Sequence, residues 1–226
     1  GNGLVYCSDH MSDDEAMDML TREIEGETLI SPRLIRYRTG RRRKTWDKNV
    51  VALGLSSGFV EPLESTSIHL IMIGVTRLMQ LFPFGGISQA VVDRYNRQAD
   101  DELEKIRDFI ILHYKVTERT DSAFWDRVRT MDIPDSLAHR IALFQESGHV
   151  FQAPGELFQV DSWLQVMLGQ RIMPRTYHHM GRMMPPQQLM QALDDLKRNI
   201  AGAVSRLPQH QAFLDHYCAP PVSKSA

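Results

Sequence analysis

Cysteine is scarce in this sequence of 226 residues. Its two cysteines, Cys7 and Cys218, stand far apart and have no partner at the spacing of a metal site or a redox motif. This usage is typical of a reducing compartment rather than of a secreted domain built on disulfides. No apolar run approaches the roughly 18 residues that a membrane span requires, and no basic region precedes an apolar core at the start. We therefore expect a cytoplasmic protein that is not embedded in a membrane.

An excess of charge of either sign is also missing. Lys and Arg together number 26 and Asp and Glu number 28, so the formal net charge is -2. This balance creates no long-range field toward a polyanion or an anionic membrane. The basic run 41–44 is typical of a solvated turn, and no spacing among the nine histidines sets two of them beside a carboxylate. We expect no nucleic-acid partner and no metal.

The Gly-x-Gly-x-x-Gly loop of dinucleotide-binding domains is absent, and so is an initiating methionine. The chain also opens within what its pattern predicts to be a strand or a turn. A hydrophobic content of 42% is enough for one substantial core or for part of a larger domain. We therefore expect this chain to be part of a longer polypeptide.

Helical patterns dominate the residues that are present. Ser12 and Glu15 form a capping box, which predicts a helix of about three turns after Ser12. Residues 66–82 are apolar on most faces, which predicts a buried helix, and residues 88–115 have the spacing of a long amphipathic helix. Shorter helices are predicted at residues 123–130, 136–145, 161–168 and 185–206.

Strands are predicted only in the first part of the chain. Residues 34–38 alternate and residues 49–53 form an apolar run, so we expect two strands joined by a basic turn. Residues 1–86 are then a small α/β segment, and residues 87–226 are a mainly helical region packed with it as one unit. The last seven residues, 220–226, are expected to be a frayed tail.

The most informative stretch is the glycine-rich turn at residues 54–67. A predicted strand enters two glycines and two serines and leaves, after Pro62, as an apolar helix. Such a turn lets the backbone approach a cofactor closely, and the free N–H groups at the helix start favour an anion. Glu64, followed by Ser65 and Thr66, can also act simply as a helix cap. Spacing alone favours the cap.

The stretch from Trp46 to Ile68 resembles the signature segment of flavin-dependent tryptophan halogenases, and this resemblance reverses that preference. Weaker similarity extends over essentially the whole chain, at Gly1–Tyr6, Arg38-x-Gly-Arg41, Arg107-Asp-Phe109, Phe124-Trp125, Gly169 and Pro174. The resemblance implies a helix-rich α/β fold. Residues 1–86 would be the C-terminal part of a flavin monooxygenase-like FAD domain, with the halide-binding turn, and residues 87–226 a helical substrate-side region.

The family's chemistry uses FAD that a separate flavin reductase supplies as FADH2. Reduced flavin and oxygen convert bound chloride or bromide into hypohalous acid, which reaches a lysine through a tunnel and halogenates an electron-rich aromatic ring. The resemblance thus implies a transient reductase partner and a small aromatic substrate. The family's lysine and its Trp-x-Trp-x-Ile-Pro segment have no match here, and none of this chain's lysines is assigned that role.

Individual residues of the turn match the family's site. Glu64 matches the catalytic carboxylate, and the backbone N–H groups of Thr66 and Ser67 match the halide site. Ser67 stands where tryptophan-specific members usually have glycine, so the choice between chloride and bromide stays open. The flavin contacts that the resemblance implies are Gly54, Leu55, Ser56, Pro62, Leu63, Ser65 and Ile68.

Substrate selection is expected from residues 151–174. The paired tyrosines and the glutamate with which tryptophan-specific relatives hold the amino acid are not evident there. Phe158 falls near the position of the stacking residue and Glu156 is a displaced candidate for the amine, but the pattern favours helix packing for both. Trp163 is either a pocket wall or part of a core seam. An indole, a phenol or a larger tryptophan-containing molecule is therefore favoured over free tryptophan.

Two other functions stay open at this point. A flavin-dependent aromatic hydroxylase has a related strand–turn–helix motif, and a non-catalytic module could use the amphipathic helix at residues 88–115 for partner contact. A homodimer is also left open. The upstream sequence would separate halogenase from hydroxylase, and binding of flavin and bromide would separate an enzyme from a scaffold.

Overall fold

The structure, a computed structural model, describes residues 2–219, and the tail predicted at residues 220–226 lies outside them. The chain divides into two compact units, with the boundary in the sequence between Thr176 and Tyr177. The expected functional division between residues 86 and 87 falls inside the first unit and stays a prediction.

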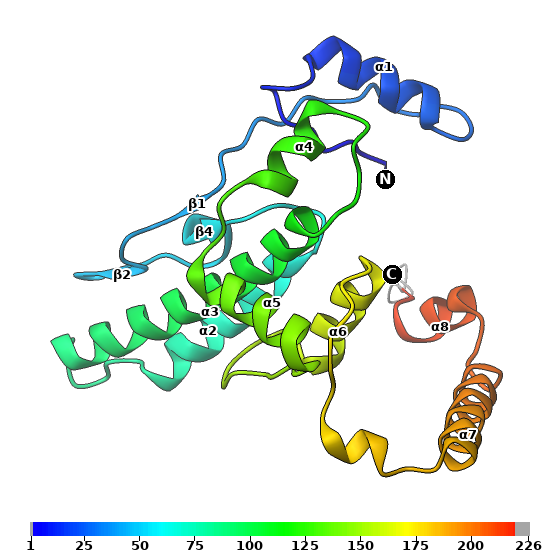
Figure 1. Cartoon of the computed structure of the whole chain (residues 1–226). Coiled ribbons are helices and arrows are strands. Elements are labelled where there is room, and N and C mark those ends of the chain that lie inside the picture. The colour runs from blue at the N-terminus through cyan, green and yellow to red at the C-terminus, as the bar shows by residue number, and fades with distance from the viewer. Residues whose placement is uncertain (1, 220–226) are drawn as a thin grey trace. The chain divides into compact units, whose positions relative to one another are not determined.

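The first unit begins with α1, Asp13–Glu23, the blue helix of Figure 1. Ser12 caps it as predicted: its Oγ accepts the N–H of Glu15 at 3.2 Å, and the Glu15 carboxylate accepts the N–H of Ser12 at 2.8 Å. These bonds satisfy two donors that a helix start otherwise leaves unpaired, and they lower the pKa of Glu15. The predicted capping box is confirmed.

The strands are shorter than the sequence predicts. The four in residues 2–219 have two residues each: β1, Gly40–Arg41, pairs with β4, Gly58–Phe59, and β2, Trp46–Asp47, pairs with β3, Val50–Val51. The strand predicted at residues 34–38 is wrong, because no described residue forms backbone ladder hydrogen bonds with it. Its apolar side chains remain exposed, Ile35 at 66%. Only residues 50–51 of the second predicted strand form one.

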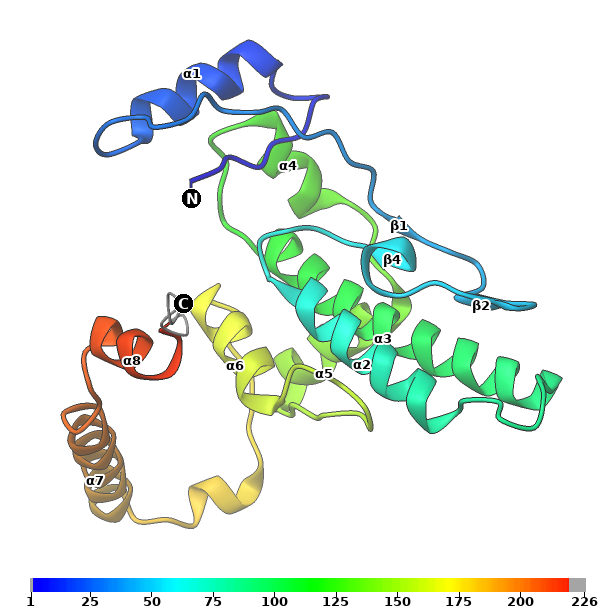
Figure 2. The same cartoon turned by 180° about the vertical axis from the view of Figure 1, so that it is seen from behind.

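Helices α2, Thr66–Gln80, and α3, Gln89–Lys115, form the centre of the first unit and lie side by side in both views (Figures 1 and 2). Arg77 of α2 donates to the buried Glu102 carboxylate of α3 at 2.7 Å, and the Tyr95 hydroxyl donates to the carbonyl of Gly74 at 3.3 Å. Because both polar links are buried, they fix the direction in which α2 leaves the turn.

The position of α2 was predicted well, but its burial was not. One face packs on α3, while Ile68, Met72 and Met79 are 69%, 65% and 68% exposed. The spacing of apolar residues shows which faces of a helix are apolar, but it does not show whether other parts of the protein pack against those faces. The buried helix predicted at residues 66–82 is therefore a half-exposed one.

Three further helices complete the first unit and agree with the predictions to within two residues at each end. They are α4, Ala123–Thr130, α5, Asp135–Ser147, and α6, Val160–Gly169. The main hydrophobic core of this unit lies between α3, α5 and α6. It contains six buried side chains: Phe109, Leu112, Leu137, Phe144, Trp163 and Met167. The helix-rich α/β class is confirmed, with its strands confined to the part of the unit before α2.

The second unit contains η2, His179–Arg182, α7, Pro186–Val204, and α8, His210–Tyr217. Pro185 and Pro186 stand at the start of α7, where proline is tolerated because the first N–H groups of a helix have no internal partner. The helix predicted at residues 185–206 is confirmed, whereas α8 was not predicted. None of the helices within residues 2–219 has both the length and the apolar character that crossing a membrane demands.

Candidate active site

The glycine-rich turn begins with the short helix η1, Gly54–Ser56. Gly54 has φ +58°, and a Cβ there would lie 2.6 Å from Cγ1 of Ile71. Glycine is needed because η1 approaches α2 this closely. The Ser56 hydroxyl closes the turn, since it accepts the N–H of Leu53 and donates to the carbonyl of Leu53. Both residues were expected to contact flavin, and both contribute to the internal structure of the turn.

A buried carboxylate, Glu61, shapes the next part of the turn. Its two oxygens accept the N–H groups of Leu63 and Glu64, each at 2.7 Å. Burial raises the pKa of the Tyr37 phenol, and the negative charge of Glu61 adds to the shift. The pKa of Tyr114 is also raised, mainly by burial and secondly by the negative charge of Glu61. No function was assigned to Glu61 from the sequence, and its place before Pro62 was the only signal of this role.

The start of α2 has no side-chain cap. Ser65 occupies the N-cap position with φ 55° and ψ 25°, a left-handed conformation that is strained for a residue other than glycine, and its hydroxyl makes no capping bond. The first turn of α2 contains no acidic residue. The amides of Thr66 and Ser67 therefore begin a helix that has neither a side-chain cap at Ser65 nor an acidic residue in its first turn.

Glu64 does not cap that helix. No backbone N–H within the described residues donates to its carboxylate, and its Oε1 lies 3.4 Å from Nε2 of His113 on α3. The Glu64 side chain is 34% exposed. The capping function that spacing alone favoured is therefore not what the structure shows, and the carboxylate keeps oxygen lone pairs open to a ligand.

The remaining predicted flavin contacts form an exposed rim on the same turn. Leu55, Leu63 and Ile68 present apolar side chains to solvent, and Pro62 and Ser65 are also exposed. An apolar rim beside uncapped amides fits the face and the electron-rich edge of a flat aromatic cofactor. The residues present are thus compatible with flavin at this turn.

The predicted substrate residues are linked to Glu64 by a row of aromatic rings. Phe109 of α3 stacks on Phe158 with centroids 3.7 Å apart, and its edge contacts Trp163 at 4.9 Å. On its other side Phe109 meets the His113 ring at 4.8 Å. Trp163 is 1% exposed within the core, which corresponds to the seam alternative, whereas Phe158 is half-buried at the edge of that core.

Glu156, the candidate amine partner, is already paired. Its carboxylate accepts from the Arg140 guanidinium and from the N–H of Ala153, and its side chain is 3% exposed. The guanidinium lies over the rings of Phe151 and Trp163, at 4.1 and 3.9 Å from their centroids. Burial lowers the pKa of Arg140, and the charge of Glu156 opposes the shift. This carboxylate is therefore not available to a substrate ammonium group.

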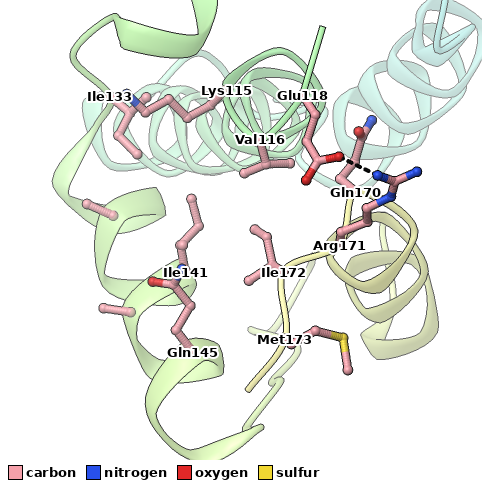
Figure 3. Close-up of a pocket in the computed structure, with 12 residues that line it drawn as sticks. Lys115, Val116, Glu118, Ile133, Ile141, Gln145, Gln170, Arg171, Ile172 and Met173 are labelled. Carbon is pink, nitrogen blue, oxygen red and sulfur yellow. Dashed lines mark hydrogen bonds and ion pairs between the residues drawn. The ribbon is translucent and has the colours of Figure 1, made fainter. Parts of the chain in front are cut away.

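A hollow of about 540 Å³ opens beside the end of α3, and α5 and the segment after α6 complete its walls (Figure 3). Ile141 and Ile172 face each other across it, and the ion pair between Glu118 and Arg171, 2.7 Å, lies at its edge. None of the individually predicted site residues lines this hollow, although residues 170–173, from the segment expected to select the substrate, do. The turn at Glu64 and this hollow are separate features of the first unit.

The described residues contain no group of three or more His, Cys, Asp and Glu side chains arranged to hold a metal. The two cysteines are free thiols, Cys218 exposed and Cys7 half-buried.

The sequence and the structure of this chain were compared with those of known proteins. The family model described as tryptophan halogenase matches residues 1–186. The chain belongs to this family. Over 147 residues it is 40% identical to a 7-chloro-L-tryptophan 6-halogenase, KtzR, of Kutzneria, and over 156 residues it is 34% identical to the tryptophan 7-halogenase RebH of Lentzea aerocolonigenes. These alignments cover 64% and 68% of this chain but only 28% and 29% of the relatives.

Solved structures agree with the family assignment. A flavin-dependent halogenase from Xanthomonas campestris superposes with a TM-score of 0.91 at 46% identity, over 96% of this chain and 44% of that one. BrvH, a flavin-dependent halogenase from Brevundimonas, gives a TM-score of 0.88 at 44% identity, over 94% of this chain and 43% of that one. The chain thus has the fold of the matching part of a halogenase and spans less than half the length of these proteins.

Proposed function

We propose that this chain provides the halide site and the catalytic carboxylate of a halogenase that uses FADH2 to transfer chlorine or bromine to an electron-rich aromatic ring. The observation that carries the proposal is the arrangement at the start of α2. There the half-exposed carboxylate of Glu64 immediately precedes Ser65 and the uncapped amides of the helix.

The halide lies at the amides of Thr66 and Ser67. Two N–H groups at the positive end of a helix favour an anion, and the absence of acidic residues in the first turn of α2 removes a competing negative charge. Flavin would bind at the exposed rim of the turn and, reduced and together with oxygen, would supply the oxidising equivalents that make the halide electrophilic. In this chain Leu55, Pro62, Leu63, Ser65 and Ile68 would hold the flavin.

Glu64 acts on the aromatic substrate. When an electrophilic halogen adds to a ring carbon, the ring becomes positively charged and must lose the proton from that carbon. A carboxylate nearby stabilises this charge, and it loses that capacity when it is replaced by a neutral amide. Its partial exposure allows a substrate to approach, and its one ion pair within the described residues, with His113, leaves oxygen lone pairs free.

The substrate we propose is an indole, a phenol or a larger tryptophan-containing molecule. KtzR and RebH are named for halogenation of tryptophan or chlorotryptophan, yet Glu156 is bound to Arg140 and cannot hold a free amino group. Phe158, at the edge of the core beside Phe109, is the aromatic surface that we assign to the substrate. We place the enzyme in the cytoplasm, where a separate flavin reductase supplies FADH2.

The test uses the intact enzyme that contains this sequence, with a flavin reductase, FAD, bromide and a panel of indoles and phenols. We expect products that gain bromine by mass and depend on bromide. A product that gains only oxygen would indicate a hydroxylase. An enzyme that forms no product and binds neither FADH2 nor bromide would indicate the interaction module instead.

A further inference from the structure

His113, in the last turn of α3, is the side chain that contacts the Glu64 carboxylate. Its Nε2 lies 3.4 Å from Oε1 of Glu64, and its Nδ1 lies 2.9 Å from the backbone carbonyl of Phe109. A carbonyl oxygen only accepts hydrogen bonds, so Nδ1 must carry the hydrogen that it donates. Nε2 is then the ring atom that faces the carboxylate.

The contact is attractive only when one proton lies between the two groups. With the Nδ1 hydrogen committed to Phe109, a neutral ring presents a lone pair at Nε2, and a carboxylate also presents lone pairs. A proton on the ring gives the two groups opposite charges, and at the ion-pair distance of 3.4 Å these charges attract each other. Nε2 is thus suited to hold one oxygen of Glu64 and to leave the other free.

The packing around His113 fixes the plane of its ring. Phe109 meets the imidazole edge-on at 81°, and Phe109 is itself stacked on Phe158 with an interplanar angle of 20°. Glu61 fixes the backbone on the other side of the contact by accepting the N–H of Glu64. The imidazole and the carboxylate are therefore both supported from behind, as a preorganised pair requires.

We propose that His113 is a positioning residue, which holds the Glu64 carboxylate in the orientation that halogen transfer needs. The inference rests on the proposed function of Glu64 and adds a second residue to it. It also assigns a role to the aromatic row, because Phe109 and Phe158 hold the histidine that orients Glu64. His113 acts through Glu64 and need not touch the substrate.

Two substitutions in the intact enzyme separate positioning from packing. His113→Phe keeps a flat ring against Phe109 and removes Nε2, so we expect kcat for halogenation to fall about 10- to 100-fold, while KM for the aromatic substrate and the rate of flavin reoxidation stay unchanged. His113→Gln offers a side-chain amide to Glu64 and should recover much of kcat. His139→Phe makes the same change at an exposed position of α5 and should leave kcat unchanged.

A measurement without turnover tests the contact itself. In protein labelled with 15N histidine, the resonance lost in His113→Phe identifies the ring, and Glu64→Gln should shift its Nε2 signal and spare the other histidines. In turnover, the double variant Glu64→Gln/His113→Phe should be no slower than Glu64→Gln alone. His113 acts only through the Glu64 carboxylate, so its replacement costs nothing more once that carboxylate is gone.

Three results would each overturn the inference. They are a wild-type kcat in His113→Phe, equal losses of kcat in His113→Phe and His113→Gln, and an Nε2 resonance that does not shift in Glu64→Gln. A wild-type enzyme that yields no halogenated product, yet shows the Nε2 shift, would instead overturn the proposed function and leave only the contact standing.

Discussion

Two glutamates of the first unit lie near opposite ends of the same row of aromatic side chains, and their surroundings differ. Glu156 is 3% exposed, and its oxygens accept from Arg140 and from the N–H of Ala153. Glu64 is 34% exposed, and its one ion pair within residues 2–219 is with His113. The first carboxylate is fully paired, whereas the second has capacity left for a ligand.

This difference indicates which carboxylate is available for chemistry. A buried ion pair compensates each charge for the loss of water, and removal of one partner leaves the other uncompensated. A half-exposed carboxylate can be altered at little cost to folding, and it can reach a bound substrate. We therefore assign stability to the Arg140–Glu156 pair and catalysis to Glu64, and four substitutions test this contrast.

The largest effect on stability is expected at the buried pair. Arg140→Met should lower the free energy of unfolding by about 3–5 kcal/mol, because the Glu156 carboxylate is then buried without its counter-charge. Urea unfolding followed by circular dichroism measures the change. The double variant Arg140→Met/Glu156→Met should lose less than Arg140→Met alone, and a larger loss would show that the ion pair is not the cause.

An intermediate effect is expected at the carboxylate that shapes the turn. Glu61→Ala removes the acceptor for the N–H groups of Leu63 and Glu64, and hydrogen bonds to a charged group contribute about 1.5–3 kcal/mol each. We expect a total loss of about 1.5–3 kcal/mol in urea unfolding, because the two N–H groups are only part-buried and can bond to water once the carboxylate is removed. The same variant should also weaken halogenation, because Glu64 is attached to this turn. A variant with unchanged stability would show that Glu61 does not hold the turn.

A similar or smaller loss is expected at Gly54. Gly54→Ala places a Cβ at φ +58° and 2.6 Å from Ile71, so strain and overpacking together should cost about 1–3 kcal/mol. Gly85→Ala is a matched control, because its Cβ would meet no atom within 4 Å. Equal melting temperatures for the two variants would contradict the close approach of η1 to α2.

The smallest effect on stability is expected at Glu64 itself. Glu64→Gln removes a charge from a half-exposed site and leaves no buried group unpaired, so the free energy of unfolding should change by less than about 0.5 kcal/mol. Urea titrations of this variant and of Arg140→Met under one set of conditions give the comparison directly. A loss as large as that of Arg140→Met would remove the distinction between the two glutamates.

The sequence predicts the helices well and the strands poorly. Capping residues and apolar spacing are local signals, so α1, α3, α4, α5 and α6 could be placed from them. The strand predicted at residues 34–38 depended on a neighbouring strand, which no local pattern reveals. The exposure of Ile68 and Met72 on α2 likewise depends on what covers the helix, and composition does not record this.

The site shows the same division between local and distant information. The glycine-rich turn and Glu64 could be recognised because they are consecutive in the sequence. The contact with His113 could not, since 49 positions separate the two residues and only the packing of α2 on α3 brings them together. The pairing of Glu156 with Arg140 also needed the structure, which removed Glu156 as a candidate for the amine.

The most direct test of the central claim compares halogenated product with flavin reoxidation in Glu64→Gln of the intact enzyme. Loss of the carboxylate should lower the halogenation rate by at least about 100-fold, while reoxidation of FADH2 continues at the wild-type rate because the amides of Thr66 and Ser67 and the flavin rim are unchanged. Equal loss of both activities, or halogenation at the wild-type rate, would contradict the assignment of Glu64 as the catalytic carboxylate.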